Sequence, residues 1–262
     1  MKKIAIEFSI VSRGTEKYTN KGYMSISKVI DSKRYIINED HNIKETNLIN
    51  GCLKADSNYT IENVVFSRLQ LITALVFERH KCVIDDNVLI LGLGNIGIGC
   101  LMYLLDNGFK KITIYVKKEN EKIRDLLKII KCKYIIDVNV ITCFNQSHKF
   151  NTYIDTTGSS LILKNIFEFS NFNNTIIILS TPREEKYLIS PLMVNRKNLL
   201  IIGGHEFNGM SNEYRQNTYE KILKVNNNKE FLKKIINTYD FSQDKLNKIK
   251  NNKENFIEVF KY

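Results

Sequence analysis

Three glycines near the middle of the chain have the spacing of a phosphate-binding loop. The sequence G-L-G-N-I-G at residues 92–97 follows the apolar run 88–91 and precedes a helical pattern from 97 to 105. Gly92 permits a tight turn, Gly94 lets the backbone approach a diphosphate, and Gly97 lets the helix pack closely on a sheet. The N–H groups of Asn95 and Ile96 then begin the helix and attract phosphate oxygens. This context predicts a dinucleotide site.

Two lysines stand where such a domain distinguishes its ligands. About 20 residues beyond the last glycine, an NAD site normally presents a carboxylate to the ribose 2′-hydroxyl. Here the second predicted strand ends at Val116-Lys117-Lys118, with Arg124 further along. Ammonium groups favour a 2′-phosphate, so Lys117 and Lys118 favour NADP over NAD. Lysines occur throughout the chain, so the alternative of a solvated pair remains open.

Buried strands and amphipathic helices alternate around this loop, which predicts a doubly wound parallel sheet of at least six strands. The expected strands and helices follow in chain order: strand 88–91, helix 97–105, strand 111–116, helix 119–131, strands 134–136 and 153–155, helix 161–169, and strands 175–179 and 199–202.

The flanking segments differ from this middle part. Residues 1–80 contain weakly alternating segments, including 3–11, 34–37 and 59–65, and predict a small β-rich domain. Residues 211–262 are charged and helical, except for a final strand at 256–260, and are expected to return to that domain. The Rossmann domain is placed at 81–210. The run 226–229 is expected to be an exposed loop.

Composition narrows the class of protein. The 262 residues are 43% hydrophobic, which is enough for a packed core, and carry a formal net charge of +11. The lysines are dispersed and form no aromatic-interleaved stripe, so neither nucleic acid nor a membrane is an expected partner. Five scattered cysteines without a C-x-x-C pair indicate reduced thiols and a cytoplasmic protein.

Four segments resemble the medium-chain dehydrogenase/reductase family, the alcohol-dehydrogenase-like enzymes. They stand in the family's order along nearly the whole chain, although each one alone is a loose match. The segments are S-R-G-T-E at 12–16, T-A-L at 73–75, D-T-T-G at 155–158 and I-G-G at 202–204.

The resemblance implies a Rossmann domain paired with a reduced GroES-like domain, with an active site in the cleft between them. It implies hydride transfer between a nicotinamide and a carbonyl, alcohol or activated alkene of a small metabolite, with biosynthetic tailoring as one setting. It adds Thr73, Thr156, Thr157 and Gly203 to the cofactor residues. It also implies a homodimer formed through the last Rossmann strand, 199–202.

The chain departs from the family's zinc-dependent members. Where those members place a cysteine and a Gly-His-Glu, this chain has Ser12 and Gly22-Tyr23-Met24, so the ligands of a catalytic zinc are missing and no metal is expected. Its amino-terminal domain is also shorter than the family's, which leaves a working active site in doubt.

A zinc-independent reaction needs other groups to stabilise an oxyanion and deliver a proton. The candidates are Tyr23, Ser12, Thr15 and His205, with Glu16 as a proton relay. Each also has a structural alternative, such as core packing for Tyr23 or a turn around Gly14 for Ser12 and Thr15. His205 follows the strand expected to end beside the nicotinamide. The other histidines, His41, His80 and His148, are expected at the surface.

Two other classes of protein remain as alternatives. One is a catalytically silent NAD(P)-binding protein that acts through a partner. The other is a methyltransferase, which the lysines disfavour, because methyltransferases usually place an acidic residue at the end of the second strand.

Overall fold

The structure is a computed structural model, and it describes residues 3–11, 24–41, 43–80, 87–145, 147–181, 189–206, 209–226, 228–251 and 256–262. The chain divides into two compact units. Unit 1 comprises residues 1–68 and 210–262, and unit 2 comprises residues 69–209. The division falls within helix α2 (Ile61–His80), so residues 69–80 of this helix belong to unit 2. Within the described part of the chain, no helix has the length and apolarity needed to cross a membrane.

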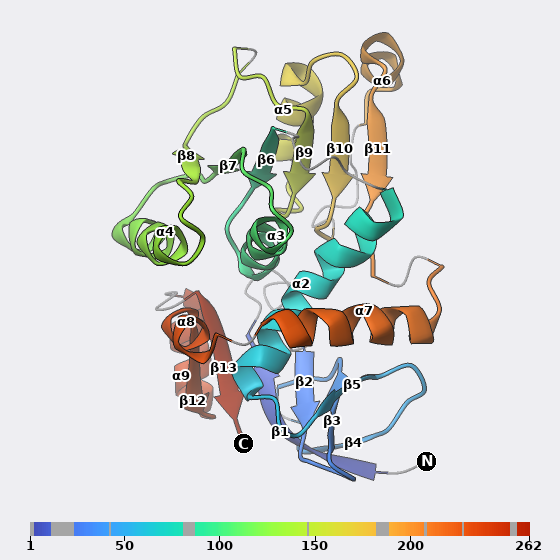
Figure 1. The fold of residues 1–262 in the computed structure, drawn as a ribbon, viewed down its shortest axis with the longest axis vertical. Coiled ribbons are helices and arrows are strands. Elements are labelled where there is room, and N and C mark those ends of the chain that lie inside the picture. The colour runs from blue at the N-terminus through green and yellow to red at the C-terminus, as the bar shows by residue number, and fades with distance from the viewer. Residues whose placement is uncertain are drawn as a thin grey trace. The chain divides into compact units, whose positions relative to one another are not determined.

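Unit 2 is built on a six-stranded parallel sheet in the order β11-β10-β9-β6-β7-β8 (Figure 1). Numbered within the unit, this is the doubly wound order 3-2-1-4-5-6 read from the other edge. The prediction of a parallel Rossmann sheet is confirmed. The strands are β6 (Val88–Leu91), β7 (Ile112–Tyr115), β8 (Asn139–Ile141), β9 (Thr152–Asp155), β10 (Thr175–Ile178) and β11 (Leu200–Gly203).

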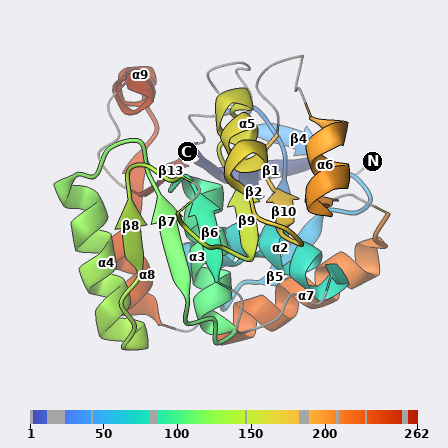
Figure 2. The same cartoon turned by 90° about the horizontal axis from the view of Figure 1, so that it is seen from above.

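Helices cover both faces of this sheet. Figures 1 and 2 show α3 on one face and α5 on the other, as right-handed crossovers to either side of β6 require. The helices that connect the strands are α3 (Asn95–Asp106), α4 (Glu121–Tyr134), α5 (Ser160–Phe169) and α6 (Pro191–Lys197).

The core of unit 2 explains why its strands are apolar throughout. All four residues of β6 are buried, because helices lie on both faces of the sheet. On the α5 side, Leu89, Leu91 and Tyr153 pack against Leu163 and Ile166 of the helix. Each such aliphatic side chain contributes about 1.5–3 kcal/mol by leaving water.

The predicted strand at 134–136 is wrong. Tyr134 still belongs to α4, and Ile135 ends the helix in the left-handed region with φ 56° and is 91% exposed. The third strand is β8 (Asn139–Ile141), a few residues later. The apolar run Tyr134-Ile135-Ile136 is a misleading signal, because Tyr134 is held by a polar contact to Asp106 rather than by a place in the sheet.

Unit 1 is built on a seven-stranded mixed sheet in the order β12-β13-β1-β2-β3-β5, with β4 also paired to β1. The central strand β1 therefore pairs with both β2 and β13, which join the two ends of the chain in one sheet. The strands are β1 (Lys3–Ile10), β2 (Met24–Ser27), β3 (Lys33–Ile37), β4 (Glu45–Asn47), β5 (Leu53–Asp56), β12 (Ile236–Asp240) and β13 (Ile257–Lys261).

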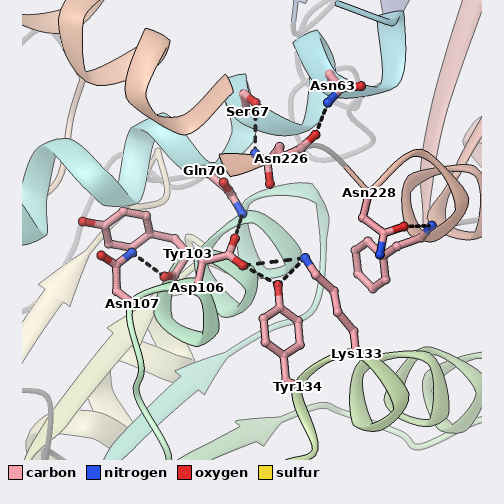
Figure 3. Close-up of polar contacts among 11 residues, drawn as sticks. Asn63, Ser67, Gln70, Tyr103, Asp106, Asn107, Lys133, Tyr134, Asn226 and Asn228 are labelled. Atoms are coloured by element: carbon pink, nitrogen blue, oxygen red, sulfur yellow. Dashed lines mark hydrogen bonds and ion pairs between the residues drawn. The ribbon is translucent and has the colours of Figure 1, made fainter. Parts of the chain in front are cut away.

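Helices α7 (Asn212–Val225), α8 (Lys229–Ile235) and α9 (Gln243–Asn251) complete unit 1. Gln216 of α7 bonds the backbone N–H and C=O of Lys54, each at 2.9 Å, and so satisfies the edge strand β5. Figure 3 shows Asn226 between two residues of α2: its Nδ2 donates to Ser67 Oγ at 2.9 Å, and its carbonyl accepts from Asn63.

Three smaller expectations for unit 1 are wrong. Residues 61–65 do not form a strand. They are the first residues of the 20-residue helix α2. In the predicted loop 226–229, Asn226 is buried and Lys229 begins α8. His41 is buried, since its Nδ1 bonds Ser9 Oγ at 2.8 Å and its ring meets Phe260 edge-on.

Candidate functional site

The register of the unit 2 sheet brings the predicted cofactor residues to one edge. Leu91 is paired with Asp155, Asp155 with Ile178, and Ile178 with Gly203, so these residues form a row across four parallel strands. Tyr115 continues the row on the other side of Leu91. The residues that follow each strand therefore lie together at the carboxyl edge, and the strand order reverses there between β6 and β9, which is where doubly wound sheets bind ligands.

Gly92 and Gly97 are required by the fold of the loop itself. Gly92 has φ +98°, and a Cβ on it would stand 2.8 Å from Thr157 Cγ2. A Cβ on Gly97 would stand 2.3 Å from the Gly92 carbonyl oxygen. The first turn of α3 is therefore pressed against the glycine turn, as the spacing predicts.

Gly94 differs, because a Cβ built on it meets nothing within 4 Å. Its φ of −83° and ψ of −168° are also open to other residues. It is the N-cap of α3, with no side-chain cap hydrogen bond and no acidic residue in the first turn. The space beside the N-cap is therefore open at the start of α3, and the positive end of the helix favours an anion there.

The D-T-T-G segment joins β9 to this loop. Thr156 Oγ1 donates to the carbonyls of Leu91 at 2.8 Å and Gly92 at 3.2 Å. Asp155 is 1% exposed, and its Oδ1 accepts from the amide of Thr157 at 2.8 Å and from its hydroxyl at 2.6 Å. Both threonines therefore lie at the predicted edge and fix its shape.

Sequence reasoning missed Ser180, which follows β10 at the same edge. Its Oγ donates to Asp155 Oδ2 at 3.0 Å, and its backbone N–H bonds the Asp155 carbonyl at 3.2 Å. The available signal was positional: a hydroxyl two residues after a buried strand occupies the same level as Thr157.

Thr73 lies on the face of α2 that packs on unit 2. A Cβ on Gly99 would stand 2.6 Å from the Leu69 carbonyl oxygen, and one on Gly204 would stand 3.2 Å from Val76 Cγ2. Thr73 shares a helix face with Leu69 and Val76, so it lies between α3 and the end of β11. Its side chain is fully buried, and among the residues that the structure describes its Oγ1 has no hydrogen-bond partner. Such an atom is costly unless a ligand satisfies it.

Lys117 and Lys118 are exposed directly after β7, at the place predicted for them. The nearest acidic side chain in the sequence is Glu119, whose Oε1 lies 4.0 Å from Arg124 Nη1. The end of β7 therefore presents ammonium groups and one carboxylate that already has a cationic neighbour.

Gly203 ends β11 in the row described above and is exposed, and a Cβ built on it would meet nothing within 4 Å. Gly204 is buried, and a Cβ on it would stand 2.4 Å from Leu179 Cδ2. His205 follows and is exposed. This places the imidazole at the same edge as the glycine loop, in the half of the sheet formed by β9, β10 and β11.

The other catalytic candidates, Ser12, Thr15, Glu16 and Tyr23, lie outside the described residues. Of the positions compared with zinc ligands, only Met24 is described, and it begins β2. Among the residues that the structure describes, no three His, Cys, Asp or Glu side chains gather as a metal site would need.

The sheet order, the glycine loop at the switch point and the separate mixed sheet define the fold of the medium-chain dehydrogenases, so the expected resemblance is confirmed for the fold. The chain is similar to Bacillus subtilis YhfP with bound NAD and to L-idonate 5-dehydrogenase from Escherichia coli. For both, the TM-score is 0.72 at 11% identity, over 99% of this chain and 90% of the other. The YhdH oxidoreductase of Salmonella enterica, in complex with NADP, gives a TM-score of 0.70 at 11% identity over the same shares.

No family model matches the sequence. A curated relative, the shikimate dehydrogenase (NADP(+)) of Clostridium beijerinckii, is 30% identical over 138 residues. The match takes in 50% of this chain and 47% of the relative, so the chain spans about half the length of the curated protein that it matches.

Proposed function

We propose that the chain is an NAD(P)-dependent oxidoreductase that transfers hydride between a nicotinamide and a carbonyl, alcohol or activated alkene of a small metabolite. One observation carries the proposal: Gly94 is the N-cap of α3, and the space that its side chain would fill is open. The fold does not need a glycine there, whereas a diphosphate approaching the helix N-terminus does.

The residues at the edge fit such a cofactor. The first turn of α3 would hold the diphosphate, and the buried Thr73 Oγ1, which has no hydrogen-bond partner among the described residues, would gain one from the ligand. When bound, a nicotinamide dinucleotide supplies the hydride. The protein's part is then to position it and to polarise the acceptor.

For the cofactor's adenosine half we propose NADP rather than NAD. Lys117 and Lys118 are exposed after β7, where they would face the ribose substituent. The carboxylate of Glu119 lies within 4.0 Å of Arg124 and is partly neutralised. The names of the similar proteins include both NAD and NADP, so the lysines carry this part of the proposal.

We propose that the reaction needs no zinc. His205, which is exposed and follows β11 at the carboxyl edge of the sheet, is a proposed proton donor. Ser12, Thr15, Glu16 and Tyr23 remain proposed partners on the sequence argument alone. An imidazole or hydroxyl can deliver the proton that accompanies hydride transfer to a carbonyl.

Steady-state oxidation of NADPH with a panel of carbonyls and enones tests the activity. Turnover with at least one acceptor is expected, and metal analysis of the active protein should find less than stoichiometric zinc. NADPH binding without turnover across the panel would favour the alternative, a silent nucleotide-binding protein. No binding of either dinucleotide would dismiss both.

For the assembly we propose a homodimer formed through the edge strand β11. Leu200 of β11 and Leu192 of α6, the helix that precedes it, are each 55% exposed, and β11 is an edge strand of the sheet that the described residues form. We also propose a cytoplasmic location, since three of the described cysteines, Cys52, Cys132 and Cys143, are free thiols. Light scattering and replacement of Leu200 by Lys test the dimer.

A further inference from the structure

The Asp155 carboxylate holds the carboxyl ends of β9 and β10 together. It is buried, and it accepts three hydrogen bonds: two from Thr157, through the amide and the hydroxyl, and one from the Ser180 hydroxyl. The carbonyl of Asp155 also accepts from the amides of Leu179 at 2.9 Å and Ser180 at 3.2 Å. Ser180 is therefore fixed by its backbone and by its side chain at once.

This contact sets the polarity of the Ser180 hydroxyl. A hydroxyl has one proton and two acceptor lone pairs, and a carboxylate only accepts. The proton of Ser180 is therefore directed at Asp155 Oδ2, and the half-buried oxygen keeps its lone pairs for another partner. At this edge Ser180 can accept a hydrogen bond from a ligand and does not donate one.

The position of Ser180 indicates which part of a dinucleotide it would meet. A dinucleotide lies across the switch point with one mononucleotide over each half of the sheet. The adenosine half lies over β6, β7 and β8, where Lys117 and Lys118 are placed. Ser180 follows β10 in the other half, beside β9 and β11. Ser180 would therefore face the nicotinamide mononucleotide of a bound dinucleotide.

We propose that Asp155 is a positioning residue that fixes the Ser180 hydroxyl as the acceptor for the amide N–H of the nicotinamide carboxamide. The inference rests on the proposed function, because it assigns one contact within the same cofactor site. The carboxamide amide is a neutral N–H donor of the cofactor, and an acceptor held by a buried carboxylate would fix the rotation of the ring. The ribose hydroxyls are the competing donors in this half.

Binding of two cofactors to the purified chain separates these donors. The first is the natural dinucleotide, and the second is its 3-acetylpyridine analogue, in which a methyl ketone replaces the carboxamide and removes the N–H donor. Replacing Ser180 by Ala should lower the affinity for the natural cofactor roughly tenfold, because the carboxamide N–H loses its acceptor. The affinity for the analogue should stay within about twofold of the wild-type value. Ser180→Thr keeps the hydroxyl and should restore the discrimination.

Asp155→Asn tests the direction of the Ser180 hydrogen bond, because asparagine has nearly the same shape as aspartate. An amide at this position would donate to Ser180 and turn its proton outward, so the variant should lose affinity for the natural cofactor and keep it for the analogue. Thr142→Ala removes an exposed hydroxyl at the same edge but after β8, so it is the matched control and should weaken neither cofactor selectively. Melting temperatures show that the variants are folded, and Ser180→Ala decides the matter if Asp155→Asn does not fold.

The outcomes are distinct. If the wild-type protein binds both cofactors and Ser180→Ala lowers the affinity for both equally, the hydroxyl contacts the ribose and the inference is overturned. An unchanged affinity for both also overturns it, while the proposed function stands. If the wild-type chain binds neither cofactor, the proposed function fails, and the inference fails with it.

Discussion

The Gly92 carbonyl oxygen lies so close to Gly97 that a Cβ on Gly97 would stand 2.3 Å from it. The turn after β6 and the first turn of α3 are thus in backbone contact. Neither residue needs a ligand to explain it, because the fold alone excludes a side chain at both positions. Gly94, between them, has no such constraint, and this difference separates the structural part of the motif from the binding part.

Alanine at each glycine should show this separation. Gly97→Ala and Gly92→Ala should lower the free energy of unfolding by about 1–3 kcal/mol or more, from overpacking at one site and the positive φ at the other. Gly94→Ala should lower it by no more than about 1 kcal/mol, the ordinary cost of alanine at an N-cap, and should weaken dinucleotide binding at least roughly tenfold. Urea denaturation and calorimetry measure the two effects. A Gly94→Ala protein that binds normally would contradict the phosphate role.

Lys117 and Lys118 should decide the cofactor preference. Replacing them by Asp and Ser removes two cations from the end of β7, so the affinity for NADP should fall by roughly tenfold or more while that for NAD is kept or improved. Titration of both dinucleotides at low and high salt measures the ratio. The control is Lys128→Ser, an exposed lysine on α4 paired to Asp125. If the ratio of the NADP and NAD affinities is the same in the double variant as in the wild type, the two lysines do not set the cofactor preference.

Thr73→Val replaces the buried hydroxyl by a methyl group of the same shape. Because Thr73 Oγ1 has no partner in the described part of the chain, the change should leave the unfolding free energy unchanged or raise it by about 1 kcal/mol. If the hydroxyl serves the cofactor, the same variant should bind it several-fold more weakly. A loss of stability together with normal binding would assign Thr73 to the fold alone.

Asp106 should stabilise unit 2 through three side chains of α2 and α4. Its carboxylate accepts from Gln70 at 2.9 Å and Tyr134 at 2.6 Å, with Lys133 Nζ at 3.6 Å (Figure 3). Burial lowers the pKa of Lys133, and the charge of Asp106 opposes this shift. Burial and Asp106 together raise the pKa of Tyr134. Asp106→Ala should destabilise the protein by about 1–3 kcal/mol. Asp125→Ala, at an exposed pair, should cost less than about 1 kcal/mol.

Tyr153 should make stability fall in alkali. Burial in the sheet raises the pKa of Tyr153 to about 12, above the ordinary value of 10.0 that the unfolded chain keeps. The unfolded chain therefore loses this proton first, and stability declines as the pH rises from about 10 to about 12. The free energy of unfolding of Tyr153→Phe, measured by urea denaturation, should fall less steeply over that pH range than that of the wild type. Equal slopes would show that the phenol does not contribute.

Local signals were sufficient for much of unit 2. Continuous apolar runs such as 88–91 and 175–178 predict buried parallel strands, and the glycine loop marks the turn at the switch point. They were insufficient at Tyr134, which belongs to helix α4 and whose hydroxyl donates to Asp106, a residue distant in sequence. Alternation also failed at 59–65, where weak local preference yields to the packing of a long helix.

The amino-acid sequence by itself determined the parallel sheet, the glycine turn and the lysines at the end of β7, because these depend on residue type and spacing along one stretch of chain. Only the tertiary structure decided that a Cβ has room at Gly94 and none at Gly97, that Thr73 Oγ1 meets no partner among the described residues, and that Ser180 donates to Asp155. Each of these depends on the distance between strands or helices that lie far apart in sequence. Such distances are set by the packing of the whole unit.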